Sequence, residues 1–443
     1  MRQTLAKAFI GIVFLLVSFP MLNTMFLKKD IGPLSGVDDT YTQPAFSLSA
    51  FWDGTYQQQF ETYCSYGFSG YRFAMRALNE FRFRLFDEAD DIVVCKDGSV
   101  IFEHYLDEFL GLSGTHFCSP DYLDETAARL RRISALAESA GKELVVVITP
   151  NKADFIAEQI PDRFYQMDRA YGQEQRGRRQ LTARLDQAGI AYVDSAELLQ
   201  SHEYPFPVFP QTGIHWTREA AIQAVDALID CLEDGGYTLK RIGVEGREEQ
   251  ACPRRGYMNS DDDIWQLMNI FSTKETTYSY PIETELIPES YDLPAVFVQG
   301  GSFTFTLLEL LADHDIVRDL DFLFYDIALY DYDRNRSAIS GLDDPSIWAK
   351  VQDSDVILLE VNEEAIYNMG SGFLPVLEEI LAGPPAASPE QGGELQIAFR
   401  DMGPWESANG VSWRWAYGND ALLVCSSVPL RKQTPTLYLS TVF

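Results

Sequence analysis

Apolar and polar positions along the chain predict helices and strands that alternate. Between residues 68 and 86, apolar residues recur at steps of three and four, which predicts one amphipathic helix. An apolar stripe at this spacing most often faces a hydrophobic core. The residues of this stripe are Tyr71, Met75, Leu78, Phe81 and Leu85.

Downstream, strand patterns and helix patterns follow one another. "DIVVCKDGSVIFE" predicts two short strands around an Asp-Gly turn, and "ELVVVITP" predicts a strand covered on both faces. Helices are predicted over 119–142, 173–188 and 217–232, and "IAYVD", "AVFVQ", "TFTLLELLADH" and "DVILLEV" continue the alternation. Residues 235–290 are polar and irregular. The pattern predicts a three-layer α/β domain with a mostly parallel sheet and helices on both faces.

The ends of the chain differ from this domain. Residues 8–26 carry no charge and are long enough to cross a bilayer, and Arg2 and Lys7 precede them. We predict a signal anchor at 1–29, a stalk at 30–59, the α/β domain at 60–385 and a β-rich extension at 386–443. The expected location is the cell membrane, with a single pass and the main domain outside the cytoplasm. A cleaved signal peptide is the alternative, and it also places the chemistry outside the cytosol.

Composition narrows the possible partners. The chain has 35 Lys and Arg against 66 Asp and Glu, so its negative field disfavours nucleic-acid binding. Six cysteines lack the C-x-x-C spacing of zinc ribbons and thioredoxin-type sites. Buried thiols or disulfides both remain open, and no metal or cofactor is expected.

Two segments offer residues for nucleophilic catalysis. Ser302 follows a predicted strand and two glycines and precedes a helix, where backbone N–H groups can stabilise an oxyanion. His215, in "FPQTGIHWTREAA", stands just before Trp216 and a helix, and histidine is the usual base for activating serine. Each also has a structural interpretation: Ser302 as a helix cap, and His215 as a partly buried polar residue.

Two further strand ends carry polar side chains. Asn151 and Lys152 follow "VVVITP", and Asn362 ends "LLEVN". Ligands of open α/β sheets bind at the carboxyl ends of the strands, so either Asn could donate to an oxyanion and Lys152 could orient substrate. Ordinary loop and cap chemistry is the alternative for all three.

Five segments in this order resemble the SGNH hydrolase-like family of the alginate O-acetyltransferases AlgX and AlgJ, with its DHHW-type relatives. These segments are "VCKDGSVIFEHYLDEFLG", "VVITPNKADFIAEQIPDRF", "FPQTGIHWTREAA", "VQGGSF" and "DVILLEVNE". The resemblance implies an SGNH-like fold in which the motifs are permuted, because the His-Trp segment precedes the serine. It implies Ser302 as nucleophile and His215 as its base. From the strand ends and the two motifs themselves, we expect Gly301, Asn151, Lys152, Trp216 and Asn362 near the oxyanion or substrate.

The sequence departs from this family at two positions. Gly213 stands where the alginate enzymes carry the Asp of their triad, and Gly301 stands where many SGNH sequences have an Asp before the serine. The best substitute acid in the sequence is Asp194, at the end of "IAYVD". A backbone carbonyl is the alternative partner for the imidazole.

The resemblance implies a serine-dependent O-acetyltransferase that acts on a cell-surface or exported polysaccharide. It also implies a membrane-bound MBOAT-type acyltransferase as the partner that delivers acetyl groups. Two alternatives remain open: a carbohydrate esterase of SGNH type, and a noncatalytic polysaccharide-binding or assembly protein whose site has degenerated.

Overall fold

The computed structural model describes residues 32–37, 42–66, 70–87, 89–256 and 258–383, together with scattered helical positions between 7 and 18 and four short strands between 397 and 425. The chain divides into two compact units, Met1–Leu381 and Ala382–Phe443. Most of the predicted signal anchor lies outside the described residues. Within the described part of the chain, no helix has the length and hydropathy to span a membrane.

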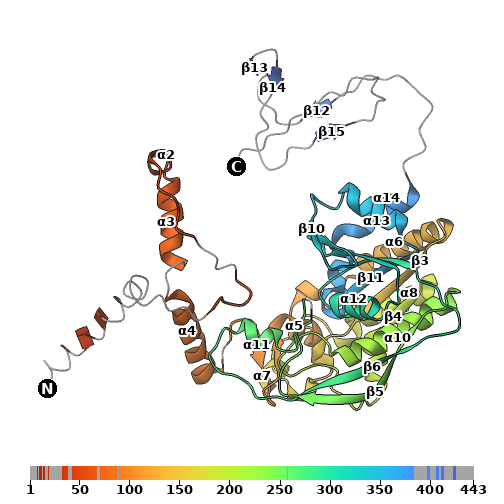
Figure 1. The fold of residues 1–443 in the computed structure, drawn as a ribbon, viewed down its shortest axis with the longest axis horizontal. Helices are drawn as coiled ribbons and strands as arrows, with labels where there is room; N and C mark the ends of the chain where they lie inside the picture. Colours follow the sequence, from red (N-terminus) through yellow and green to blue (C-terminus); the bar gives the residue numbers. More distant parts are fainter. Residues whose placement is uncertain are drawn as a thin grey trace. The chain divides into compact units, whose positions relative to one another are not determined.

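A seven-stranded sheet organises the first unit, in the order β10-β9-β8-β7-β11-β3-β4 (Figure 1). Strands β8, β7, β11, β3 and β4 run parallel, and β9 and β10 extend the edge antiparallel. The prediction of a mostly parallel sheet is therefore confirmed. The strands are β3 (Glu143–Thr149), β4 (Tyr192–Asp194), β7 (Ala295–Gly300), β8 (Asp319–Phe324), β9 (Ala328–Tyr330), β10 (Arg336–Ala338) and β11 (Val356–Asn362).

Helices cover both faces of this sheet because its central strands are apolar on both sides. In β3, Val145 and Val147 join a core with α10 and α12, whereas Val146 and Ile148 join a second core with α6, α8, α13 and α14. Strands that are buried on both faces appear in the sequence as continuous apolar runs. The helices are α6 (Pro120–Ser139), α8 (Gly177–Ala188), α10 (Arg218–Asp234), α12 (Thr304–Asp313), α13 (Pro345–Asp353) and α14 (Phe373–Ala382).

Smaller elements surround the carboxyl edge of the sheet. The predicted hairpin is present as antiparallel strands β1 and β2. The short elements are β1 (Ile92–Val94), β2 (Val100–Phe102), α5 (Glu103–Leu110), η2 (Gly114–His116), η3 (Lys152–Asp154), η4 (Ala157–Gln159), α7 (Asp162–Tyr165), η5 (Gln173–Gln175), α9 (Ser195–Gln200) and η6 (Glu363–Gly372).

The stretch 235–290, predicted to be irregular, contains regular structure. Strands β5 (Arg241–Gln250) and β6 (Tyr278–Leu286) pair antiparallel, and α11 (Asp263–Leu267) lies between them in the chain. Most side chains of β5 are at least partly exposed, without a regular alternation of buried and exposed positions. A strand that buries no consistent face leaves no period-2 hydrophobic signal.

The first helices correct the predicted core. Helix α4 (Tyr71–Phe86) forms where the apolar periodicity predicts it. Only Tyr71 and Met75 of its stripe are partly buried, whereas Leu78, Phe81 and Leu85 are exposed. The interpretation of this stripe as a core face is therefore wrong for its second half. Helices α2 (Leu48–Trp52) and α3 (Thr55–Tyr66) precede it, within and just after the predicted stalk.

The second unit is described only at four short strands. Two antiparallel pairs form, β12 with β15 and β13 with β14. The rest of the predicted β-rich extension lies outside the described residues. Its strands are β12 (Ile397–Phe399), β13 (Glu406–Ala408), β14 (Val411–Trp413) and β15 (Leu423–Cys425). In the first unit, Cys95, Cys118, Cys231 and Cys252 are free thiols.

Candidate active site

Ser302 lies in the tight turn between β7 and α12, at the carboxyl edge of the sheet. The turn needs glycine at 300, because a Cβ there would lie 2.5 Å from Thr304 Oγ1 and 2.7 Å from Glu360 Cβ. The N-cap of α12 is Phe303, and no side chain caps the helix. The interpretation of Ser302 as a cap is therefore excluded, and its hydroxyl is available for another partner.

His215 lies on a loop that hydrogen bonds from Lys152 hold in place. The Lys152 side chain is fully buried, and its Nζ donates hydrogen bonds to the carbonyl oxygens of Pro210 (2.7 Å) and Gly213 (2.5 Å), and to that of Val100 (2.8 Å). The ring of His215 packs on Phe303, with ring centroids 4.9 Å apart. The loop and the Ser302 turn are thus fixed against each other.

The imidazole of His215 joins two side chains. Its Nε2 lies 2.9 Å from Ser302 Oγ, within hydrogen-bonding distance. Its Nδ1 is hydrogen-bonded to Asp263 Oδ2. The His215 and Asp263 side chains keep 13% and 20% of their surface exposed, so this chain of contacts lies at the protein surface rather than in the core. Serine, histidine and aspartate are connected in the order that a catalytic triad requires.

Asp263, the first residue of α11, was missed by the sequence analysis. Its Oδ1 accepts hydrogen bonds from the backbone amides of Ile214 (2.9 Å) and Ile264 (2.7 Å), which leaves Oδ2 directed at the imidazole. A Cβ at Gly213 would lie 2.9 Å from the carbonyl oxygen of Asp261 and 3.1 Å from Asp263 Oδ1. Gly213 therefore leaves the space into which this segment and its carboxylate fit.

Asp194 does not take the place proposed for it from the sequence. Its Oδ2 pairs with Arg178 at 2.9 Å, and its Oδ1 caps α9 by accepting from the amide of Glu197. Strand β4 lies three positions from β7 in the sheet order, with β11 and β3 between them. The carboxylate that contacts His215 comes instead from the stretch that showed no periodicity. A run of three aspartates, 261–263, was the available signal.

Gly301 also does not have the oxyanion-binding role that was expected from the sequence. Its amide donates to the buried carboxylate of Glu360 at 2.6 Å, so it is not free to bind an oxyanion. The same carboxylate accepts from Thr304 Oγ1 at 3.0 Å and Thr149 Oγ1 at 2.5 Å. Burial raises the pKa of Glu360, against the effect of these donors. A Cβ at position 301 would meet Tyr325 Oη at 2.9 Å, which explains the glycine before the serine.

The remaining predicted residues have structural partners. Asn151 Nδ2 donates to Glu108 at 2.8 Å, and Asn362 Nδ2 donates to the carbonyl oxygen of Pro150 at 3.1 Å. Trp216 is buried against Phe303, and its indole N–H has no hydrogen-bond partner among the residues that the structure describes. The structure brings Ser302 and His215 together, and it does not direct either Asn amide at Ser302.

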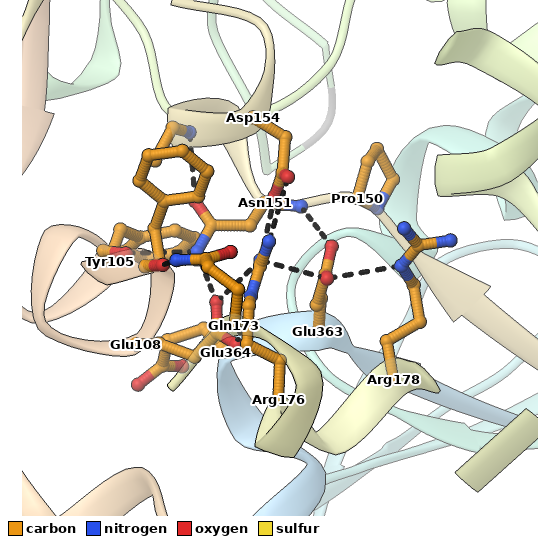
Figure 2. A network of polar contacts seen from close by, with 12 residues as sticks. Tyr105, Glu108, Pro150, Asn151, Asp154, Gln173, Arg176, Arg178, Glu363 and Glu364 are labelled. Carbon is orange, nitrogen blue, oxygen red and sulfur yellow. Dashed lines mark hydrogen bonds and ion pairs between the residues drawn. The ribbon is translucent and has the colours of Figure 1, made fainter. Parts of the chain in front are cut away.

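Figure 2 shows the residues around the ends of β3 and β11, where Arg176 lies within a cluster of buried carboxylates. It contacts Glu108 at 2.9 Å, Asp154 at 2.7 Å and Glu363 at 2.8 Å. Arg178 lies on the other side of Glu363, at 3.1 Å. Burial and the neighbouring carboxylates raise the pKa of Glu363 to about 8. This cluster connects α5, the end of β3, α8 and the end of β11.

A cavity of ≈ 40 Å³ lies beside Ser302. Burial raises the pKa of Glu364, one of its lining residues, to about 7. Tyr325 also lines this cavity, and burial raises its pKa. The other polar residues of the cavity lining are Tyr105, Gln299, Ser302, Glu360, Asn362, Glu364, Asn368 and Ser371. The Tyr325 hydroxyl lies beside Gly301, since a Cβ at 301 would be 2.9 Å from its oxygen, so it is a side-chain donor near the place where charge would develop during attack by Ser302.

These features define a class of site. A serine at a strand–helix turn, a histidine on a neighbouring loop and an aspartate behind it form the arrangement used by serine hydrolases and acyltransferases on several folds. In the described part of the chain, no group of His, Cys, Asp or Glu side chains has a geometry that could hold a metal ion.

Comparison with known families agrees with this class. Residues 118–279 match the family described as SGNH hydrolase-like domain, acetyltransferase AlgX. The match includes His215 and Asp263, and Ser302 lies beyond its end. The resemblance to this family that the sequence suggested is confirmed. No curated protein sequence matches the chain significantly.

Several solved structures are similar at low identity. The O-acetyltransferase domain of Pseudomonas putida AlgJ is 17% identical, with 65% of this chain and 98% of that chain covered and a TM-score of 0.39. Pseudomonas aeruginosa AlgX is 16% identical, with coverages of 64% and 65% and a TM-score of 0.38. Bacillus cereus PatB1 with a sulfonyl adduct is 8% identical, with coverages of 64% and 98% and a TM-score of 0.40.

Proposed function

We propose that this protein is a serine-dependent O-acetyltransferase that acts on a cell-surface or exported polysaccharide. The observation that carries the proposal is the position of His215 between Ser302 and Asp263. The match of residues 118–279 to a family of acetyltransferase domains supports the choice of acetyl transfer.

In the first step, His215 Nε2 takes the hydroxyl proton of Ser302 while Oγ attacks the carbonyl carbon of an acetyl donor. Collapse of the tetrahedral intermediate breaks the bond to the donor's leaving group, which receives the proton from His215. The product is an acetyl ester on Ser302. Asp263 holds the proton of Nδ1 and so keeps Nε2 free to act as the base.

In the second step, a sugar hydroxyl replaces the leaving group. His215 removes its proton, the oxygen attacks the acetyl-serine carbonyl, and Ser302 leaves with the proton returned by His215. The backbone amide of Ser302 and the hydroxyl of Tyr325, two residues that line the same cavity, are the donors that we assign to the oxyanion in both steps. No metal or nucleotide takes part in this scheme.

The proposal also includes the cellular location of the domain and the partner protein that supplies its acetyl groups. We place the domain outside the cytoplasm, anchored by the apolar run at residues 8–26. An acetyl group made available in the cytosol then has to cross the membrane. A membrane-bound acyltransferase of the MBOAT type is the partner that fits this need.

The alternatives differ in how they use the same site. An esterase shares the acetyl-serine and differs only because water attacks it in the second step. A noncatalytic scaffold was suggested by Gly213 and Gly301. Asp263 provides a carboxylate despite Gly213, and Gly301 is required by Tyr325, so these two residues no longer favour the scaffold.

The test is product analysis with an acetyl ester donor, with and without an oligosaccharide acceptor. We expect acetylated oligosaccharide from the wild type, and a loss of about 10³-fold or more in Ser302→Ala and in His215→Ala. Thermal unfolding should show that both variants fold, with Ser302→Ala close to the wild type and His215→Ala somewhat less stable because its ring packs on Phe303. Free acetate as the main product in the presence of acceptor would identify an esterase, and unchanged transfer in Ser302→Ala would refute the mechanism.

A further inference from the structure

The outer face of α4 presents an apolar stripe that no other described part of the chain covers. Ala74, Leu78, Phe81 and Leu85 follow one another at steps of four, three and four, so they lie on one side of the helix. Leu78, Phe81 and Leu85 are 51%, 55% and 62% exposed. We call these four residues the α4 stripe. Water-exposed apolar side chains gathered on one helix face mark an interaction surface.

The opposite face of α4 is fixed to the body of the first unit. Asn79 donates to the carbonyl oxygen of Met268 at 3.0 Å, and Glu80 accepts from the amides of Phe271 and Ser272, both at 2.9 Å. The α4 stripe therefore points outward from an anchored helix.

Charge along α4 is opposite to that of the whole chain. The helix contains four arginines and one acidic residue, Glu80, whereas the chain carries a net charge of −31. At 100° per residue, Arg82 and Arg84 fall on the two sides of the α4 stripe, and Glu80 falls toward the body. Arg82 pairs with Asp90 at the surface, where such a pair is weak. Arg84 is 66% exposed and pairs with Glu80, whose carboxylate is mostly buried.

We propose that the α4 stripe rests on the surface of an anionic lipid bilayer. An apolar helix face bordered by arginines fits the boundary between acyl chains and negatively charged headgroups. Helix α2, which precedes α3 and α4 in the chain, also carries exposed apolar side chains, with Leu48 at 70% and Trp52 at 81%. The uncharged run 8–26, followed by Lys28 and Lys29, lies upstream in the same chain.

A second copy of the chain fits this surface less well. A symmetric dimer through the α4 stripe would bring the same arginine-edged face of both copies together. Like charges would then face each other across the contact, whereas lipid phosphates would neutralise them. The proposal concerns the α4 stripe alone, so it holds or fails whether or not Ser302 is catalytic.

The α4 stripe lies close to the element that carries the acid of the candidate active site. The segment held by the inner face of α4 continues directly from α11, which begins with Asp263. Phe83 also packs on Trp265 of α11, with ring centroids 5.9 Å apart. One helix, about 10 Å in diameter, thus separates the α4 stripe from the element that carries the acid.

Lipid photolabelling tests the proposal with the full chain reconstituted in vesicles. The vesicles contain phosphatidylglycerol, phosphatidylethanolamine and a lipid with a photoreactive group in its acyl chain, and labelled peptides are identified by mass spectrometry. We expect labelling at Leu78, Phe81 and Leu85. The matched control is Leu286, which is 56% exposed on β6, and we expect it to remain unlabelled.

Substitutions in the α4 stripe and vesicles of different lipid composition then distinguish between a bilayer and a second copy of the chain at this surface. Replacing Leu78, Phe81 and Leu85 by Ser should lower labelling of α4 by at least about tenfold, because these exposed side chains contribute to docking rather than to folding. Vesicles of phosphatidylcholine alone should also lower it severalfold, since the headgroup charge is lost. The same results are expected in Ser302→Ala. Labelling of α4 no stronger than that of Leu286 overturns the proposal, as does a dimer that the triple variant converts to a monomer.

Discussion

The carboxyl edge of the sheet has two halves that use similar residues for different purposes. At the end of β7, Ser302 meets His215 and Asp263, and these side chains are partly exposed. At the ends of β3 and β11, Asn151 and Glu363 are buried, and their polar atoms are engaged by neighbouring side chains and backbone. Both halves satisfy the rule that places ligand sites at this edge.

The difference teaches that the position of a residue at the edge is not enough to indicate a functional site. A residue can act on a substrate only if its reactive atom reaches solvent and is not already committed to a structural bond. Arg176, with three carboxylates around it, ties α8 to its neighbours as a buried ion cluster. Removing a side chain from the site at the end of β7 should therefore lower activity more than stability. Removing one from the buried cluster at the ends of β3 and β11 should lower stability more than activity.

The largest effect is expected at Asp263. Asp263→Asn should lower acetyl transfer by about 10²- to 10⁴-fold, because an amide favours the wrong imidazole tautomer while the geometry is kept. The matched control is Asp194→Asn, at the strand end first expected to supply the acid, where we expect activity per folded molecule to be retained. Steady-state kinetics on an acetyl ester measure both. Equal losses in the two variants would contradict the assignment of the acid to Asp263.

A smaller effect, on stability, is expected in the buried half. Arg176→Met should lower the free energy of unfolding by about 3–5 kcal/mol, because it leaves buried carboxylates without their cation. Arg179→Met is the control: this arginine is 54% exposed and pairs with exposed Glu174, so we expect a loss of at most about 1 kcal/mol. Urea denaturation provides both values. A change in the activity of folded Arg176→Met would mean that the two halves are coupled.

The smallest effect is a pH dependence that originates at Lys152. Burial lowers the pKa of Lys152 from 10.5 to about 7, so between these values the unfolded chain binds a proton that the folded chain lacks. The contribution of Lys152 to stability is therefore present above pH 10.5, and it is lost as the pH falls through 7. Between pH 8 and 10, this group should raise the free energy of unfolding by up to about 1.4 kcal/mol per pH unit.

Lys152→Met removes this slope, and Lys96→Met, at a half-exposed lysine paired with Asp162, should keep it. Denaturation at pH 8, 9 and 10 compares the two variants. The four carbonyl oxygens around the Lys152 Nζ favour the charged ammonium. If they outweigh burial, the wild type will show no slope in this range, and the lowered pKa would be refuted.

The sequence predicted the elements whose residues face a core on a regular period. The buried strands β3, β7 and β11 and the helices α6, α10 and α12 all appear close to their predicted ranges. The turn at Ser302 and the loop at His215 were predicted as the site because they flank such elements. Their juxtaposition depends on the order of strands in the sheet, which apolar periodicity does not encode.

The acid was missed for a physical reason. Asp263 begins a five-residue helix between two partly exposed strands, where no apolar period marks an element. Its contact with His215 spans 48 positions of the chain and depends on how 261–265 folds back on the loop at 212–214. The second half of the apolar stripe predicted for 68–86 was misjudged for the opposite reason, since its periodicity is clear but does not say what the apolar face contacts.

Gly213 shows that one volume beside His215 can be filled from either of two places in the chain. A side chain at 213 and the carboxylate of Asp263 compete for the same space, since even a Cβ at 213 would lie 3.1 Å from Asp263 Oδ1. A side chain at 213 would therefore require the segment that carries Asp263 to shift, so an Asp-x-His motif and a Gly-x-His motif with a distant Asp are two alternative ways to supply one carboxylate. When a related sequence has Gly two residues before its His, the acid should be sought in the segment that folds over that glycine.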